Sequence, residues 1–343
     1  MTRFGSLAYY APRAAVAVVA LGLIGVVGSA LTRYLNAYVI QVLFFVGCNV
    51  ILAVSLNLVN GHAGQFSIGH AGFMAIGAYL TAWISVTYGK QWLAPFEDHP
   101  AAWVIGCAYL VALMLVGGLG AALGGLVIGL PSLRLRGDYL AIATLGFGEI
   151  IKVLLLNIDA VGGARGLTGI PRYSTLGLCL AAAVVTVVLL RNLMGSTHGR
   201  ALLALREDET AAEAVGIDVA SYKTSAFVIG AFFAGVAGCL YAHYLQYINP
   251  RGFDFMKSIE LVLIVVLGGG NIWGVIVAAV AVTLLPEALR NTDELLAFLP
   301  AKWVSWVPDD PRMVIYSALL IGVMLLKARK GRQRDGPPAK GGG

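Results

Sequence analysis

The sequence has little charge. Only 12% of its 343 residues are charged, compared with about 25% in ordinary soluble domains, whereas 59% are hydrophobic. These hydrophobic residues suffice for about ten bilayer-spanning helices of about 20 residues each, which leaves little chain for a soluble catalytic domain. The composition therefore predicts an all-α polytopic integral membrane protein with about ten transmembrane helices.

Features typical of other classes of protein are also absent from the sequence. The short segments of alternating polar and apolar residues that characterise membrane β-barrels do not occur. No G-x-x-x-x-G-K-[ST] phosphate-binding motif occurs, so the chain is not expected to hydrolyse ATP by itself. The four cysteines are scattered singly in apolar runs, without the spacing of metal ligands or of a disulfide framework. We therefore expect no catalytic residues, no metal site, no cofactor bound by this chain and no nucleic-acid partner.

Apolar runs divide the chain into a transmembrane domain over residues 1–326 and a basic tail over 327–343. The tail lacks apolar residues to bury, so it is predicted to be disordered, with its basic half near anionic lipid headgroups. The predicted membrane helices cover residues 14–31, 37–59, 71–87, 103–130, 139–157, 176–191, 223–247, 253–267, 272–289 and 313–326.

The basic tail also indicates an orientation. Lys and Arg are usually concentrated on the cytoplasmic side of a membrane protein, so both termini are predicted to be cytoplasmic. Counting spans from there places residues 195–222 in the cytoplasm and residues 88–102 and 291–312 outside.

A polar but uncharged segment separates two of the predicted helices. Residues 55–80 are rich in glycine, amide, hydroxyl and imidazole groups and contain no Lys, Arg, Asp or Glu. This composition is typical of non-helical backbone held inside a membrane protein, and such broken helices often line transport sites; a tight cytoplasmic turn is the alternative. The residues expected to line a substrate path here are Asn57, Asn60, His62, Gly64, Gln65, Ser67 and Gly69.

A second break contains three consecutive glycines, Gly268, Gly269 and Gly270. Glycine is unfavourable in a helix by up to about 1 kcal/mol per residue, so a helix is not expected to continue through this run. The break is either a re-entrant hinge or an ordinary turn, and we include its glycines in the candidate substrate path.

One long connection, residues 195–222, is rich in charge. Apolar residues recur in it near helical spacing, which predicts a short amphipathic helix that ends at a glycine. Such a helix either inserts into a groove of a partner protein or lies on the membrane surface. Its acidic residues oppose contact with an anionic leaflet, so a protein partner is favoured. The candidate contact residues are Arg206, Glu207, Asp208, Glu209, Glu213 and Gly216.

Two opposite charges, Glu149 and Lys152, fall inside a predicted membrane helix. Residues three apart lie on one helix face, so the two side chains can neutralise each other. Ionisable residues in a membrane often mark a transport pathway, but a self-compensating pair can also be purely structural.

Five blocks together resemble a known family. The sequence is similar to the LivM-type permease subunit of bacterial branched-chain amino acid ABC transporters. The blocks that carry this resemblance are residues 55–80, 133–152, 162–171, 205–240 and 259–274.

This resemblance implies that residues 1–326 form a permease domain of an ATP-driven importer in the bacterial inner membrane. The implied partners are a second, LivH-like permease, two cytoplasmic ATPases that bind ATP and magnesium, and a periplasmic substrate-binding protein. It also implies that residues 206–216 form the segment that couples the permease to the ATPases. The implied substrates are branched-chain, hydrophobic amino acids, although related permeases carry urea, short amides or aromatic acids.

A path lined by amides, hydroxyls and backbone dipoles suits a net-neutral zwitterion with an apolar side chain. Two other classes remain open from the residues themselves. A membrane-embedded enzyme would need a cluster of acid, base or metal-binding groups, and a secondary transporter would need neither a coupling helix nor an ATPase.

Overall fold

The computed structural model describes residues 34–96, 102–132 and 138–288, together with Gly25, Gly28, Thr32, Ile321 and Gly322. Most of the predicted helices over 14–31 and 313–326, the connection 291–312 and the tail lie outside the described residues. The chain divides into two units, Met1–Ala279 and Val280–Gly343, and the arrangement below is that of the first unit.

Six helices in the described ranges are long and apolar enough to cross a membrane. Helix is the expected form of such runs, because a membrane interior offers no water to bind the backbone N–H and C=O groups. The helices are α2 (Ala37–Asn57) with its π-helical extension η1 (Leu58–His62), α3 (His70–Ile84) with η2 (Ser85–Gly89), α5 (Ala102–Ser132), α6 (Asp138–Asn157), α7 (Leu176–Gly195) and α10 (Val219–Leu245). The fold is thus that of an all-α polytopic membrane protein.

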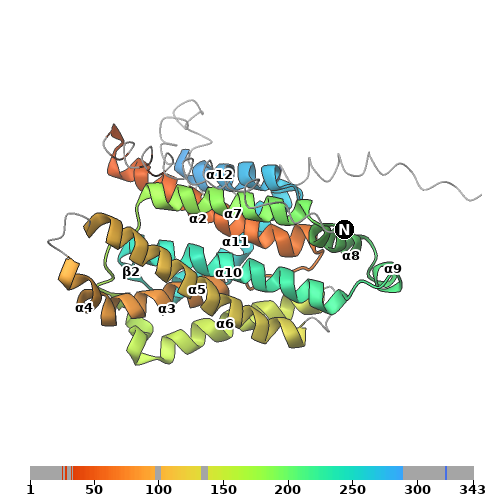
Figure 1. Cartoon of the computed structure of the whole chain (residues 1–343), viewed down its shortest axis with the longest axis horizontal. Helices are drawn as coiled ribbons and strands as arrows, with labels where there is room; N and C mark the ends of the chain where they lie inside the picture. Colours follow the sequence, from red (N-terminus) through yellow and green to blue (C-terminus); the bar gives the residue numbers. More distant parts are fainter. Residues whose placement is uncertain are drawn as a thin grey trace, which may run out of the picture. The chain divides into compact units, whose positions relative to one another are not determined.

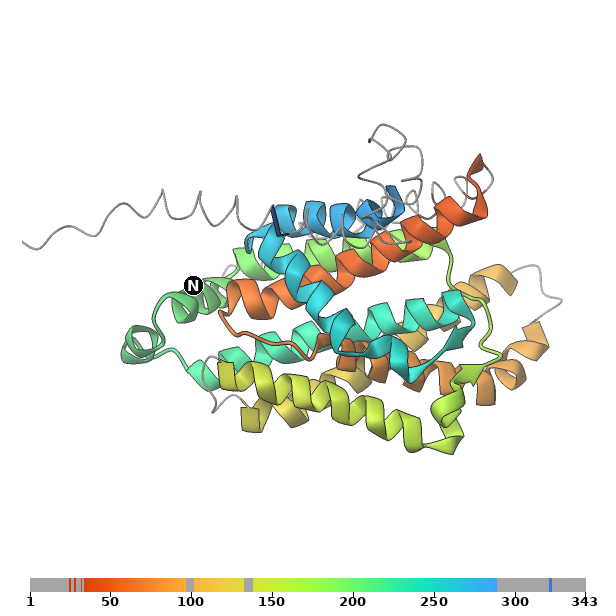
Figure 2. The same ribbon diagram turned by 180° about the vertical axis from the view of Figure 1, so that it is seen from behind.

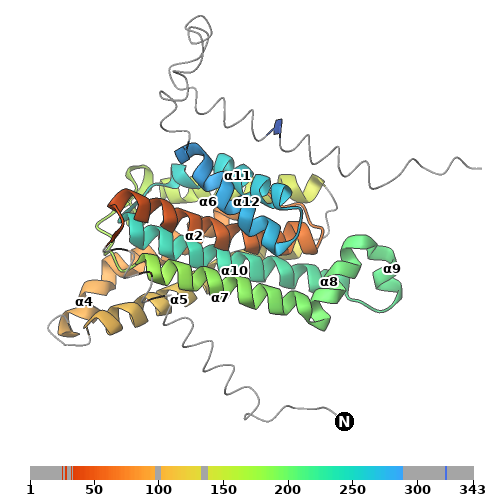
Figure 3. The ribbon, with the colours of Figure 1, turned by 90° about the horizontal axis from the view of Figure 1, so that it is seen from above.

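The opposite ends of these helices carry different short elements (Figure 1). At one end lie α8 (Thr197–Glu207) and α9 (Glu209–Ala214), which extend beyond the ends of α7 and α10 (Figure 3). At the other end lie α4 (Lys90–Leu93) and a pair of antiparallel strands, β1 (Leu167–Thr168) and β2 (Tyr247–Ile248). The remaining short helices are η3 (Ala94–Phe96), η4 (Asp159–Val161), η5 (Gly163–Arg165) and η6 (Pro250–Phe253).

Helix α10 packs against α2, α3 and α5 in the centre of the unit. Three glycines, Gly77 of α3, Gly117 of α5 and Gly235 of α10, lie where these helices cross. A Cβ atom on Gly77 would lie 2.6 Å from the carbonyl carbon of Gly235, so the backbones themselves are in contact. Small residues allow this close approach in membrane proteins. The hydrophobic effect does not drive helices together there, because lipid tails are as apolar as the side chains.

The predicted helix over 253–267 is found within two residues of its predicted bounds. Helix α11 (Phe255–Gly268) has 14 residues, which corresponds to about 21 Å of helix, whereas the hydrocarbon core is about 30 Å thick. It is short because β2 and η6 occupy the chain after α10, and α11 begins only when the side chain of Asp254 caps its first turn. Of the ten predicted transmembrane helices, six are therefore long enough to span a membrane within the described residues, and α11 is not among these six. The apolar helix α12 (Ile272–Ala288) is also shorter, at 17 residues.

The starts of α3 and α11 meet within the unit. The backbone N–H of Ala71 donates to the Ser258 hydroxyl over 3.3 Å. In Figure 2, α11 crosses the face nearest the viewer, and α6 lies along the same face. Two helices that begin inside the protein, rather than at its ends, thus converge beside α6.

Candidate functional site

The first break leaves α2 through a π-helical turn and then runs without helix from Ala63 to Gly69. Gly64 has φ +67°, which favours glycine. The side chain of Asn60 holds the open backbone, because its Nδ2 donates to the Ser67 carbonyl (3.1 Å) and its Oδ1 accepts from the Ser67 N–H (3.2 Å). The Asn60 amide therefore supplies the backbone hydrogen bonds that a neighbouring strand or water would otherwise make with Ser67.

Residues 65–69 fold back into the protein. Gln65 and Ser67 are buried, and the Ile68 N–H donates to the Thr144 hydroxyl of α6 over 3.0 Å. The imidazole Nε2 of His70 lies 2.9 Å from the hydroxyl of Ser55, which precedes the end of η1 by seven residues, or about 10 Å of helix. The segment therefore turns near Gly64 and re-enters the unit.

The second break is a tight turn between α11 and α12. Gly269 and Gly270 both have positive φ, +70° and +75°, and α12 begins two residues later. Of the two alternatives open for these glycines, the structure has the turn.

Three sequence segments that we singled out separately meet at Gly61. The Asn57 amide Nδ2 donates to the carbonyl of Gly270 over 3.1 Å, which joins the two breaks. The guanidinium Nη1 of Arg206 donates to the Gly61 carbonyl over 3.2 Å, and a Cβ atom on Gly64 would lie 2.8 Å from the Cγ of Arg206. A displacement of α8 would therefore act directly on the backbone of the first break.

Gln65 is the most conspicuous polar side chain in this region. It is 3% exposed, and neither its amide nitrogen nor its amide oxygen has a hydrogen-bond partner among the described residues. An unsatisfied buried polar group costs about 1–3 kcal/mol. A buried amide that makes no internal hydrogen bond is suited to contact with water or with a polar solute.

Residues 195–222 form two helices rather than the single helix expected. The helix is interrupted at Asp208. The carboxylate of Asp208 accepts hydrogen bonds from the N–H groups of Thr210 (2.8 Å) and Ala211 (3.0 Å) and so caps α9. Gly216 has φ +87° and lies two residues past the end of α9, as predicted for a terminating glycine. A capping aspartate in mid-segment is a start signal for a helix, and it accounts for the second one.

The predicted contact residues of this segment divide by environment. Arg206 pairs with Glu207 over 2.6 Å, and Glu209 forms an ion pair with Lys223 of α10. Glu213 is exposed, and so is the neighbouring Val215, at 77%. Val215 was not among the predicted residues.

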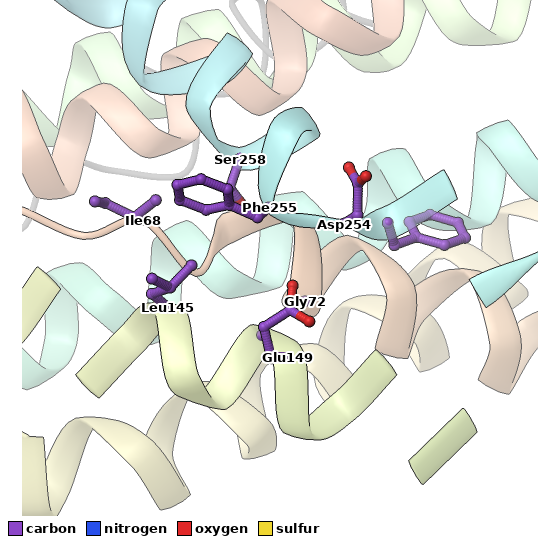
Figure 4. A pocket seen from close by; sticks show the side chains of 9 residues that line it. Ile68, Gly72, Leu145, Glu149, Asp254, Phe255 and Ser258 are labelled. Carbon is purple, nitrogen blue, oxygen red and sulfur yellow. The ribbon is translucent and has the colours of Figure 1, made fainter. Parts of the chain in front are cut away.

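Glu149 and Lys152 form an ion pair on α6. Glu149 points into a crevice beside the starts of α3 and α11 (Figure 4). In addition to Glu149, the crevice is lined by Ile68, Gly72, Leu145, Gly148, Phe253, Asp254, Phe255 and Ser258. Ile68, at the end of the first break, and Glu149 of the ion pair therefore border the same narrow crevice. His62, by contrast, binds the Asn57 carbonyl through Nδ1 (3.1 Å) and lies apart from His70 and its Ser55 partner.

Comparison with known proteins identifies the chain. Residues 38–328 match the family described as the permease component of the branched-chain amino acid transport system. The chain belongs to this family. No solved structure matches it.

Three members of this permease family show the degree of similarity. The high-affinity branched-chain amino acid transport system permease protein LivM of Escherichia coli is 34% identical over 300 residues, and that of Salmonella typhimurium is 35% identical over 300 residues. Each alignment covers 76% of this chain and 66% of the relative, so the chain spans just under two thirds of either protein. A probable branched-chain amino acid transport permease protein LivM of Methanocaldococcus jannaschii is 25% identical over 315 residues, which cover 83% of this chain and 89% of that protein.

Proposed function

We propose that this chain is the transmembrane permease subunit of an ATP-driven importer of branched-chain amino acids. The observation that carries the proposal is the family match over residues 38–328, together with the transport role in the names of the relatives. A permease is a transport subunit rather than an enzyme, so ATP hydrolysis falls to partner ATPases. The further partners in this proposal are a second permease and a substrate-binding protein outside the membrane.

The substrate path, in this proposal, follows the first break. Its residues offer amide, hydroxyl and backbone groups without fixed charge, and Gln65 has free hydrogen-bonding capacity. Such groups can replace water around a zwitterion while apolar neighbours contact an aliphatic side chain. The Gly268–Gly270 turn is not a second re-entrant segment in this proposal. It supports the path through the hydrogen bond between Asn57 and the Gly270 carbonyl.

Coupling to ATP hydrolysis runs through α8 and α9 in the same proposal. Glu207, Glu213 and Val215 face outward and offer the contact surface for an ATPase, whereas Arg206 reaches inward to Gly61. Closure of the ATPases would displace α8, and the Arg206 contact would pass that displacement to the backbone around Gly61 and Gly64.

The experiment that tests this role replaces Arg206 with Ala in the assembled importer. Loss of the guanidinium removes the link to Gly61, so ATP hydrolysis should continue while ATP-driven leucine uptake into proteoliposomes falls several-fold. Arg200→Ala is the matched control, because Arg200 lies exposed on the same helix. Equal uptake by the two variants, with ATPases bound to both, contradicts the coupling role.

Orientation is tested by labelling. Gln91 and Glu213 are exposed and lie at opposite ends of the unit, so single cysteines there should react from opposite sides of the membrane. With the termini cytoplasmic, Q91C reacts with an impermeant maleimide added outside, and E213C reacts only after the membrane is opened. The four native cysteines are replaced by Ala in both chains. Labelling of E213C from outside in intact cells would reverse the proposed orientation.

A further inference from the structure

Among the six spans that the structure describes, only α6 carries a charged side chain near its middle. Helices α2, α3 and α5 contain no Asp, Glu, Lys or Arg, and the single charges of α7 and α10 lie four residues from a helix end. Glu149, by contrast, lies ten residues after the start and eight before the end of the span Tyr139–Asn157. Helix α11 adds Lys257 and Glu260, which pair over 3.0 Å.

Helix α6 is also the span that the rest of the unit covers least. Only 22% of its residues are buried, compared with 72% for α10. Ile142 is 65% exposed and Val153 is 51% exposed, and the side chain of Glu149 between them is 39% exposed. A partly exposed carboxylate near the middle of a membrane span is costly, even when a lysine on the same helix pairs with it.

The crevice beside α6 opens on the same side. Figure 4 shows Glu149 below the start of α11, with Asp254 and Phe255 across from it. Asp254 caps α11 by accepting from the Lys257 N–H over 3.1 Å, and Phe255 is exposed. A narrow crevice bordered by two carboxylates, those of Glu149 and Asp254, thus opens on this face.

The exposed face of α5 differs in every one of these respects. Leu115, Leu119, Leu123 and Val127 are exposed there, and α5 carries no charge along its length. Such a face is suited to lipid. The described positions of the first predicted helix do not cover α6 either, because a Cβ atom on Gly28 would lie 2.7 Å from the backbone nitrogen of Gly177 in α7.

We propose that the face formed by α6 and the start of α11 is where the second permease subunit of the importer packs. The inference rests on the proposed function, which supplies that subunit. Its helix would approach closely at Gly146, where a Cβ atom would meet nothing within 4 Å, and would present polar groups to Glu149 and Lys152. The crevice is then enclosed between two chains, and the first break leads into it through Ile68.

Photo-crosslinking in the intact importer tests this interface. A photoreactive phenylalanine analogue at Ile142 or Val153 should give an adduct with the summed mass of the two permease subunits. The same analogue at Leu119 or Leu123 of α5 should give lipid adducts only. Peptide mapping by mass spectrometry identifies the partner in each adduct.

Two matched glycine variants give a second measurement. Gly146→Phe should release the second permease from the purified complex, because the phenyl ring would occupy the space that a helix of the second permease fills in this proposal. Gly106→Phe on α5, where a Cβ atom also meets nothing within 4 Å, should leave the complex intact.

Several outcomes overturn the interface. Adducts of Ile142 and Val153 with lipid only, with residues 313–326 of the same chain or with a second copy of this chain each show another occupant, as do permease adducts from α5. Leucine uptake and bound ATPases are measured in the same preparations. Normal uptake with any of these adducts leaves the proposed function standing and removes only the interface, whereas absence of both uptake and ATPases removes the function itself.

Discussion

The breaks at residues 63–69 and 268–270 each join two helices, but their backbones are supported differently. The first runs through seven residues without helix, and its backbone is bound by side chains of Asn60 and Thr144. The second reverses direction over two glycines with positive φ. Glycine content is common to both breaks, whereas polar side chains that can bind an open backbone are concentrated in the first. The polar side chains, and not the glycines, therefore distinguish re-entrant backbone from a turn.

The largest effect is expected for Gly69→Leu and Gly64→Leu in the first break. A Cβ atom on Gly69 would overlap the carbonyl of Thr144, and one on Gly64 would crowd Arg206, so both leucines should abolish leucine uptake. Uptake by proteoliposomes and the amount of chain in the membrane are measured together. Gly106→Leu, at an uncrowded glycine, is the control and should transport normally. Wild-type uptake by both variants would show that the segment is no more constrained than the second break.

An intermediate effect is expected when the amide support of the first break is removed. Asn60→Ala deletes both hydrogen bonds to Ser67 and leaves a buried N–H and C=O without partners, which costs about 1–3 kcal/mol. Thermal unfolding in detergent should occur at a lower temperature, and uptake should fall. Asn271→Ala is the counterpart in the second turn, where an exposed side chain accepts one hydrogen bond of 3.3 Å from Trp273, so its effect should be smaller. Equal losses in the two variants would contradict the distinction.

The smallest effect is expected at Gly270 itself. Its φ of +75° makes Ala unfavourable by about 1 kcal/mol, but a Cβ atom there would lie no closer than 3.8 Å to Gly61. Gly270→Ala should therefore lower the unfolding temperature slightly and leave uptake near the wild-type rate. Gly270→Asn should be milder still, because Asn tolerates the left-handed region better. Loss of uptake in the Asn variant would indicate that this turn moves during transport.

The long helices were predictable because their apolar runs are continuous. The predicted bounds 37–59, 103–130 and 139–157 lie close to the spans Ala37–His62, Val104–Leu130 and Tyr139–Asn157. Hydropathy also placed the start of α11 within two residues, but it did not show the elements that precede this helix. The start of α11 at Phe255 depends on the Asp254 cap and on the pairing of β2 with β1, which joins residues about 80 positions apart.

The candidate site was predictable in composition but not in its contacts. Asn57, Asn60 and Gln65 were identified because amides are rare in apolar surroundings. The contacts of Asn57 with the Gly270 carbonyl and of Arg206 with the Gly61 carbonyl are tertiary arrangements that no spacing in the sequence encodes. Thr144 was missed for the same reason, since it binds Ile68 from a helix that begins 70 residues later. The roles of all these residues in transport remain predictions.

The contact of Gly77, Gly117 and Gly235 has a mechanical consequence. Where three backbones touch without intervening side chains, no rotamer change can absorb a sliding motion, so α3, α5 and α10 behave as one rigid block. We therefore expect any motion between inward-open and outward-open states to be a movement of the helices outside this block relative to it. Helices α6 and α11 contact this block mainly near the start of α3. We therefore expect these two helices to move relative to the block.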